Sequence, residues 1–372
     1  MNTRVPALLA IVFAALLGAI AWASPDPNRV TDRGTYEASA AHVIVPDCSD
    51  LQCFRVLVPW VLGRLPGSSS VRWKAYAAIA NAAAAVGVWL LCLSFGFGIR
   101  AATMASALSA FGFGSLYTLH DPFTPDPLMF AIGPFMTSDL IRGRFARAAG
   151  TGIVGVLAKE FAAAPLYAFA LFDAAAGQWR SALRSLAAGN AVFLAWALLT
   201  LTLMLRFGYS WGWNGVGSAD VAHGAALALW AARQSARGMA FAMFNEFGAL
   251  YLLAPAGFAL APAPVRRLAL ASVPIAVVFA YVQQPDRALW NFHYLVTPLA
   301  ALVLERVPAA LAWTAIVLFA VGNLRVGAQL PIATISHVAI AASLLLSLVS
   351  VAAVLRASFA AHRGLPVGAA AR

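Results

Sequence analysis

Apolar segments of roughly 20 residues recur along the whole chain, and this feature limits the possible folds more than any other. A helix of that length crosses a hydrocarbon core about 30 Å thick, and shorter segments can cross with thinning or polar ends. Of the 372 residues, 62% are hydrophobic and 10% are charged. The pattern predicts an all-α polytopic membrane bundle of about 10 to 12 membrane segments. The predicted segments are 5–23, 75–95, 101–119, 127–141, 186–205, 239–261, 268–282, 288–304, 308–322 and 335–355.

Small residues are frequent in these segments, as in the stretch "AAIANAAAAVG", and they allow helices to pack closely. The sequence shows no internal repeat and no long linker. We therefore expect one integral membrane domain over 1–372. Within it we expect a first extracytoplasmic loop at 24–73 and a cytoplasmic tail at 357–372.

The net charge of +11 is explained by membrane topology and not by nucleic-acid binding. The basic residues are dispersed among apolar segments, whereas a nucleic-acid interface gathers them on one soluble face. Cytoplasmic loops retain Lys and Arg, so we place both termini in the cytoplasm. The basic stretches 142–147, 178–184 and 264–267 then share that side. Most acidic residues fall on the outer side, where an extracytoplasmic enzyme would have its catalytic face.

The first apolar segment follows Arg4 and ends in "AWA", a small-residue pattern typical of signal-peptidase sites. It is longer than the usual apolar region of a signal peptide, which favours a retained first helix over a cleaved one. Cleavage would leave the following loop on the same side of the membrane.

The first outer loop contains "FRVLVPWVLGRLP", which is amphipathic and too short to span the membrane. We expect an interfacial helix there, with Arg55 and Arg64 at the level of the lipid headgroups. Such a helix could frame the access of a lipid-borne substrate. Cys48 and Cys53 precede or begin this stretch in a predicted oxidising compartment, where both a disulfide and free thiols are possible.

The stretch "GVLAKEFAAAPL" puts Lys159 and Glu160 side by side in an otherwise apolar region. The basic clusters before and after this stretch are both expected in the cytoplasm. An even number of membrane crossings must therefore separate them. We expect two short broken or tilted helices at 148–158 and 161–173, with Pro165 kinking the second. The charges could be an ion pair that ends a helix, or they could face substrate in a water-filled cavity.

Two further polar turns are predicted at the outer side. The turn in "TLHDPFTPDPLMF" carries Asp121 and Asp126, which could serve proton transfer, or could solubilise the loop and cap the next helix. The turn in "YVQQPDRALW" carries Asp286 and Arg287. An arginine there could clamp a phosphate or anchor a helix end.

These features together resemble a family. Asp32 near Tyr36, the stretch "FRVLVPWVLGRLP", the Asp-containing turn, "GVLAKE" and the late "DR" turn are similar to bacterial multi-pass membrane proteins related to the GT-C glycosyltransferases. The resemblance covers roughly residues 1–305. It implies an enzyme of the bacterial inner membrane that moves a sugar from a polyprenyl-phosphate carrier to an envelope acceptor at the extracytoplasmic face.

The resemblance also implies roles for individual residues. Asp32 would be the general base on the acceptor hydroxyl, and Arg33 follows it where many relatives carry a second acid. Cations would stabilise the charge of the departing phosphate, and acids would orient the sugar or acceptor. The implied substrate-binding residues are Arg55, Asp121, Asp126, Lys159, Glu160, Asp286 and Arg287.

Two other classes of protein fit the same residues. A transporter or flippase for a lipid-linked amphiphile also uses broken helices and paired charges, and a non-catalytic membrane subunit could carry the acids only as caps. No residue spacing demands a cofactor, although acidic loops could hold a divalent metal. The expected partners are membrane lipid and the lipid-linked sugar donor.

Overall fold

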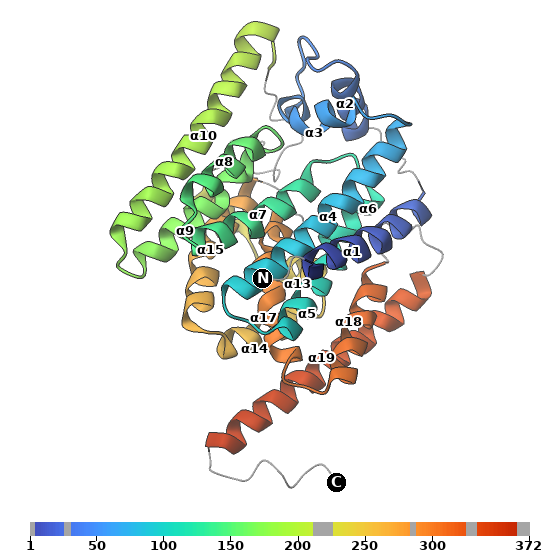
Figure 1. Ribbon diagram of the computed structural model, residues 1–372, viewed down its shortest axis with the longest axis vertical. Coiled ribbons are helices and arrows are strands. Elements are labelled where there is room, and N and C mark those ends of the chain that lie inside the picture. The colour runs from blue at the N-terminus through green and yellow to red at the C-terminus, as the bar shows by residue number, and fades with distance from the viewer. Residues whose placement is uncertain (1–3, 26–30, 211–225, 283–287, 325–332, 363–372) are drawn as a thin grey trace.

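The computed structural model describes residues 4–25, 31–210, 226–282, 288–324 and 333–362 (Figure 1). In these ranges the chain forms helices joined by turns, and it contains no β-strand. The helices are α1 Arg4–Ala23, α2 Thr31–Ala41, η1 Leu51–Phe54, α3 Leu57–Leu62, α4 Ser69–Ser94, α5 Ile99–Ala110, α6 Phe113–His120, α7 Asp126–Ile141, α8 Phe145–Val156, η2 Glu160–Ala163, α9 Ala164–Ala174, α10 Trp179–Phe207, α12 Leu227–Arg233, α13 Ala236–Phe247, α14 Leu250–Leu260, α15 Ala263–Val282, η3 Leu289–Phe292, α17 His293–Leu304, α18 Ala309–Asn323 and α19 Ala333–His362.

The predicted all-helical membrane bundle is confirmed. Within the described ranges, five helices are long and apolar enough to cross a membrane: α1, α4, α10, α15 and α19. Helix α4 is the centre of the fold, because its alanine-rich surface packs against α1, α5 and α7. Helix α10 lies along one edge and contacts mainly α8 and α9, so much of its apolar surface faces outward (Figure 1).

Two predicted spans are broken rather than continuous. The segment 101–119 divides into α5 and α6 at Phe111 and Gly112, where the Trp290 ring occupies the space that a side chain at position 112 would need. The segment 239–261 divides into α13 and α14, which are bent by 92°. Gly248 lies at that bend with a φ of +51°, a left-handed conformation that glycine adopts without steric cost.

The two short helices predicted around Lys159 and Glu160 are present. Helix α8 ends at Val156, the 3₁₀ turn η2 begins at Glu160, and α9 begins at Ala164. Pro165 does not kink the second helix, contrary to the prediction. It lies in the first turn of α9, where proline fits because no backbone N–H is needed.

The first outer loop differs from the prediction in its helices. The stretch expected as one interfacial helix forms η1 and the six-residue α3, and Arg55 lies between them. An additional helix, α2, precedes them and packs against both. These elements lie at one end of the bundle, beside the end of α10 (Figure 1). Arg64 is exposed and stacks on the Trp60 ring at 4.2 Å.

Candidate functional site

Four charged side chains from three parts of the chain meet beneath the first outer loop. Arg55 follows η1, Asp126 begins α7, and Lys159 and Glu160 lie at the break between α8 and α9. We call these four residues the outer charge cluster, after the side of the membrane that the sequence predicts for this loop. A backbone hydrogen bond of 2.9 Å from Leu57 N to Leu157 O joins the outer loop to the break. The loop and the broken helices therefore build one site.

Arg55 and Glu160 form a two-point ion pair. Arg55 Nη2 donates to Glu160 Oε1 at 2.7 Å, and Arg55 Nε donates to Oε2 at 3.2 Å. The two side chains are only 12% and 14% exposed. Burial alone would lower the pKa of Arg55, but Glu160 and Tyr36, through their charges and hydrogen bonds together, outweigh it and raise that pKa well above the usual range. Arg55 is therefore a permanent cation, and its side chain is largely covered by the protein.

Lys159 pairs with Asp126 and not with its neighbour Glu160. Lys159 is 4% exposed, and its Nζ donates to Asp126 Oδ1. The extended backbone of Lys159 (φ −162°, ψ 142°) explains the choice, because adjacent side chains on extended backbone point to opposite sides. The adjacent charges of the sequence therefore belong to two separate ion pairs.

Aromatic rings form one wall of the site. The Tyr36 and Trp73 rings lie 5.6 Å apart, and the Trp73 and Phe123 rings lie 5.4 Å apart. Arg55 Nη1 donates to the Tyr36 hydroxyl at 3.2 Å. Burial raises the pKa of Tyr36 to about 12, so this phenol stays protonated at neutral pH. Arg33 lies over the Phe123 ring at 4.5 Å, on the same wall.

The start of α7 is fixed by residues that the sequence did not single out. Tyr76 Oη donates to Pro125 O at 3.1 Å and accepts from Leu128 N at 3.3 Å. Thr124 Oγ1 accepts from the backbone N–H of Asp126 at 3.3 Å. Pro125 is the N-cap of α7, and the Asp126 carboxylate reaches Lys159. A tyrosine 49 residues away in sequence thus holds the turn that carries Asp126, and no local motif reveals this contact.

Asp32 lies in the first turn of α2 and is half-buried. Its Oδ1 accepts a hydrogen bond of 3.0 Å from Gln52 Nε2. Asp32 lies one turn before Tyr36 on α2, and the Tyr36 hydroxyl accepts from Arg55, so Asp32 borders the outer charge cluster. Asp32 is predicted from the sequence as a site residue, but Gln52 is not, because no motif in the loop marks this glutamine as functional.

The remaining predicted site residues are Asp121, Asp286 and Arg287. Asp121 is half-buried and ends α6, at the turn that leads to Asp126. Asp286 and Arg287 lie outside the described residues. Among the residues that the structure describes, no group of three or more His, Cys, Asp or Glu side chains could hold a metal ion.

The comparisons with known proteins support the fold. No family model matches the chain, and no curated protein sequence matches it. A solved structure is similar: the archaeal oligosaccharyltransferase AglB from Archaeoglobus fulgidus, in complex with an inhibitory peptide and a dolichol-phosphate. The TM-score is 0.51 at 15% sequence identity, over 91% of this chain and 56% of AglB. The chain therefore has a GT-C-like fold and spans little more than half the length of that relative.

Proposed function

We propose that this protein is a membrane glycosyltransferase that moves a sugar from a polyprenyl-phosphate carrier to an envelope acceptor at the extracytoplasmic face. The observation that carries the proposal is the outer charge cluster, in which two buried cations meet at a helix break beneath an outer loop. The GT-C-like fold supports it, and so does the dolichol-phosphate bound to the similar AglB.

In this proposal Asp32 is the general base. The acceptor hydroxyl attacks the anomeric carbon of the sugar, its proton passes to Asp32, and the bond from that carbon to the phosphate oxygen breaks. The polyprenyl phosphate leaves with the bonding electrons. Asp32 suits this task because it is half-buried and borders the cluster without being one of its ion-pair partners.

Arg55 and Lys159 are the cations for the donor phosphate. Its departure builds negative charge, and preorganised cations in a site with little water stabilise that charge strongly. The fork of Arg55 already binds a carboxylate at two points, and the same fork matches phosphate oxygens. Asp126, Glu160 and Asp121 orient the sugar or the acceptor. Asp286 and Arg287 would act from the late outer turn.

The proposal includes the cellular setting. The enzyme would reside in the bacterial inner membrane with both termini in the cytoplasm, so that the cluster opens to the outer side. Arg55 and Lys159 supply the positive charge at the phosphate, and a divalent ion could add to it through the acids of the outer loops.

A transporter or flippase for a lipid-linked amphiphile is the second candidate. The broken helix pairs α8–α9 and α13–α14, together with buried charges, are features that transporters use. A transporter would move the lipid-linked sugar without consuming it. A non-catalytic subunit would need none of these charges for activity.

Mass spectrometry of lipid-linked sugars and envelope glycans in a deletion strain distinguishes these candidates. For a glycosyltransferase we expect the donor lipid to accumulate and one glycan to lose a sugar. Wild-type protein should restore both, and Asp32→Asn should be made at normal amounts without restoring either. A normal glycan profile in cells carrying only Asp32→Asn would refute Asp32 as the base.

A further inference from the structure

The proposed base Asp32 has a hydrogen-bond donor on a separate element. Gln52 Nε2 donates to Asp32 Oδ1 at 3.0 Å, although the two residues are 20 positions apart. A carboxylate has two oxygens, and a general base needs one of them for the proton that it removes. A donor on Oδ1 therefore fixes the orientation of the carboxylate and leaves Oδ2 for the proton.

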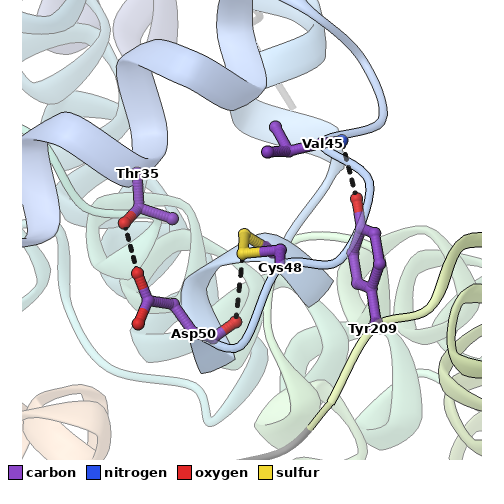
Figure 2. Close-up of a disulfide and its surroundings, with 6 residues drawn as sticks. Thr35, Val45, Cys48, Asp50 and Tyr209 are labelled. Atoms are coloured by element: carbon purple, nitrogen blue, oxygen red, sulfur yellow. Dashed lines mark hydrogen bonds between the residues drawn. A yellow bond between two sulfur atoms is a disulfide. The ribbon is translucent and has the colours of Figure 1, made fainter.

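Gln52 is held by a disulfide. Cys48 forms a disulfide (Figure 2). Its partner is Cys53, with the two Cα atoms 6.5 Å apart, and Gln52 lies between the two cysteines in the sequence, inside the loop that they close. Leu51 and Cys53, the residues on either side of Gln52, are both buried. They pack in one cluster with Leu203 at the end of α10. Covalent closure and packing thus fix the backbone of Gln52.

The same loop is tied to elements on both sides. Thr35 Oγ1 donates to Asp50 Oδ2 at 2.7 Å, and Thr35 lies one turn after Asp32 on α2 (Figure 2). On the other side, Ser210 N donates to Cys48 O at 3.0 Å. The Tyr209 hydroxyl also accepts from Val45 N, three residues before the loop, at 3.0 Å (Figure 2). The disulfide loop is therefore fastened between α2 and the segment that follows α10.

We propose that Gln52 is a positioning residue for Asp32, and that the Cys48–Cys53 disulfide loop holds its amide against the carboxylate. This inference rests on the proposed function, because it requires Asp32 to be the base. The loop would then set both the direction of the base and the position of Arg55, which follows Cys53 by two residues.

Several other charged and titratable groups lie around Asp32, and substitutions at Gln52 leave their residue types unchanged. Helix α2 packs against η1 and α3, so these elements supply its immediate surroundings. The charged and titratable side chains on and next to these elements are Arg33, Tyr36, Glu37, His42, Asp50, Arg55 and Arg64, with Asp126 beyond Tyr36.

The test is a pH profile of sugar transfer. Membrane vesicles from the deletion strain carrying each variant contain the native donors, and the loss of polyprenyl-phosphate-linked sugars is followed by mass spectrometry. Gln52→Ala removes a donor from the ionised base, so we expect the acid limb of the rate profile to move up by about half to one pH unit. Gln52→Glu should move it further, because it places a second carboxylate beside the first.

Thr35→Val is the matched control. It removes a hydrogen bond to the same loop without touching Asp32, so it should leave the acid limb in place even if it lowers the amount of protein. The double variant Cys48→Ser, Cys53→Ser should move the limb in the same direction as Gln52→Ala by a smaller shift. An unmoved limb in that double variant would remove the disulfide from the proposal.

The outcomes separate this inference from the proposed function. If Asp32→Asn abolishes transfer but Gln52→Ala and Gln52→Glu keep the wild-type acid limb, the positioning role is refuted and the base assignment stands. If Asp32→Asn transfers sugar at the wild-type rate, the base assignment itself is wrong. Should Gln52→Ala accumulate poorly, Gln52→Glu carries the test, since it preserves the length of the side chain.

Discussion

Helix α7 carries a buried acid at each end, and the two acids differ in the exposure of the cations that pair with them. At its start, Asp126 pairs with Lys159, which is 4% exposed. Near its end, Asp139 pairs with Arg147 at 2.9 Å and lies 3.9 Å from Arg144. The side chains of these two arginines are 64% and 52% exposed. The same helix thus joins a buried ion pair to a pair that opens to the surface.

The difference shows which charged side chains lose hydration free energy when the protein folds. A buried charge loses its hydration and must recover that free energy from its partner, whereas an exposed arginine keeps most of its water. The arginines near Asp139 belong to the predicted basic turn at 142–147. The preference of cytoplasmic loops for Lys and Arg is enough to explain them. The buried pair at Asp126 has no such explanation, which is why we assign it to the site.

The largest effect should come from Lys159→Met. This change leaves the Asp126 carboxylate buried without its cation, so we expect the free energy of unfolding to fall by about 3–5 kcal/mol. Thermal unfolding in detergent measures this loss of stability, and Arg147→Met is the control at the other end of α7. The double variant Asp126→Asn, Lys159→Met should regain much of the stability but no transfer activity. Equal losses in Lys159→Met and Arg147→Met would contradict the comparison.

Arg55→Lys should act mainly on chemistry. The lysine keeps the positive charge but loses the fork that binds two oxygens, so we expect sugar transfer to slow by about 10- to 100-fold. The rate in membrane vesicles gives the measurement. Arg144→Lys makes the same exchange at the exposed end and should leave the rate unchanged. A wild-type rate in Arg55→Lys would show that the fork has no part in binding the donor.

A smaller effect is expected from Tyr76→Phe at the start of α7. The change removes the hydroxyl that bonds Pro125 O and Leu128 N, so we expect a loss of about 1–2 kcal/mol in stability. Transfer should also slow, because the turn that directs Asp126 loosens. Ser138→Ala is the control at the other end, where it removes the 2.8 Å contact with Ser94. A matching decrease in transfer for Ser138→Ala would argue against a special role for the outer end.

The smallest effect should follow Asp139→Asn. Its partners are exposed, so we expect a change below about 1 kcal/mol in stability, weakening further at high salt. Sugar transfer should be unaffected. Unfolding scans at low and high salt check the first expectation, and donor consumption in vesicles checks the second. A severe loss of transfer would place Asp139 in the mechanism and overturn the contrast between the two ends.

Much of the architecture could be predicted from the sequence, because apolar length and basic turns act locally. The break at Lys159 and Glu160 followed from the two basic clusters that flank it. The splits at Gly112 and Gly248 could not be predicted in the same way, since the first depends on the distant Trp290 ring and the second on a backbone conformation. For the site, the sequence named Asp32, Arg55, Asp126, Lys159 and Glu160, but it gave no sign of Gln52 or Tyr76.

By itself, the sequence determined an all-helical membrane protein and the few polar side chains that must be accommodated in it. Only the tertiary structure decided which charge meets which. Arg55 and Glu160 are 105 residues apart, and Lys159 and Asp126 are 33 apart. Electrostatic attraction depends on distance in space and on exclusion of water, and both are set by packing after the helices have formed.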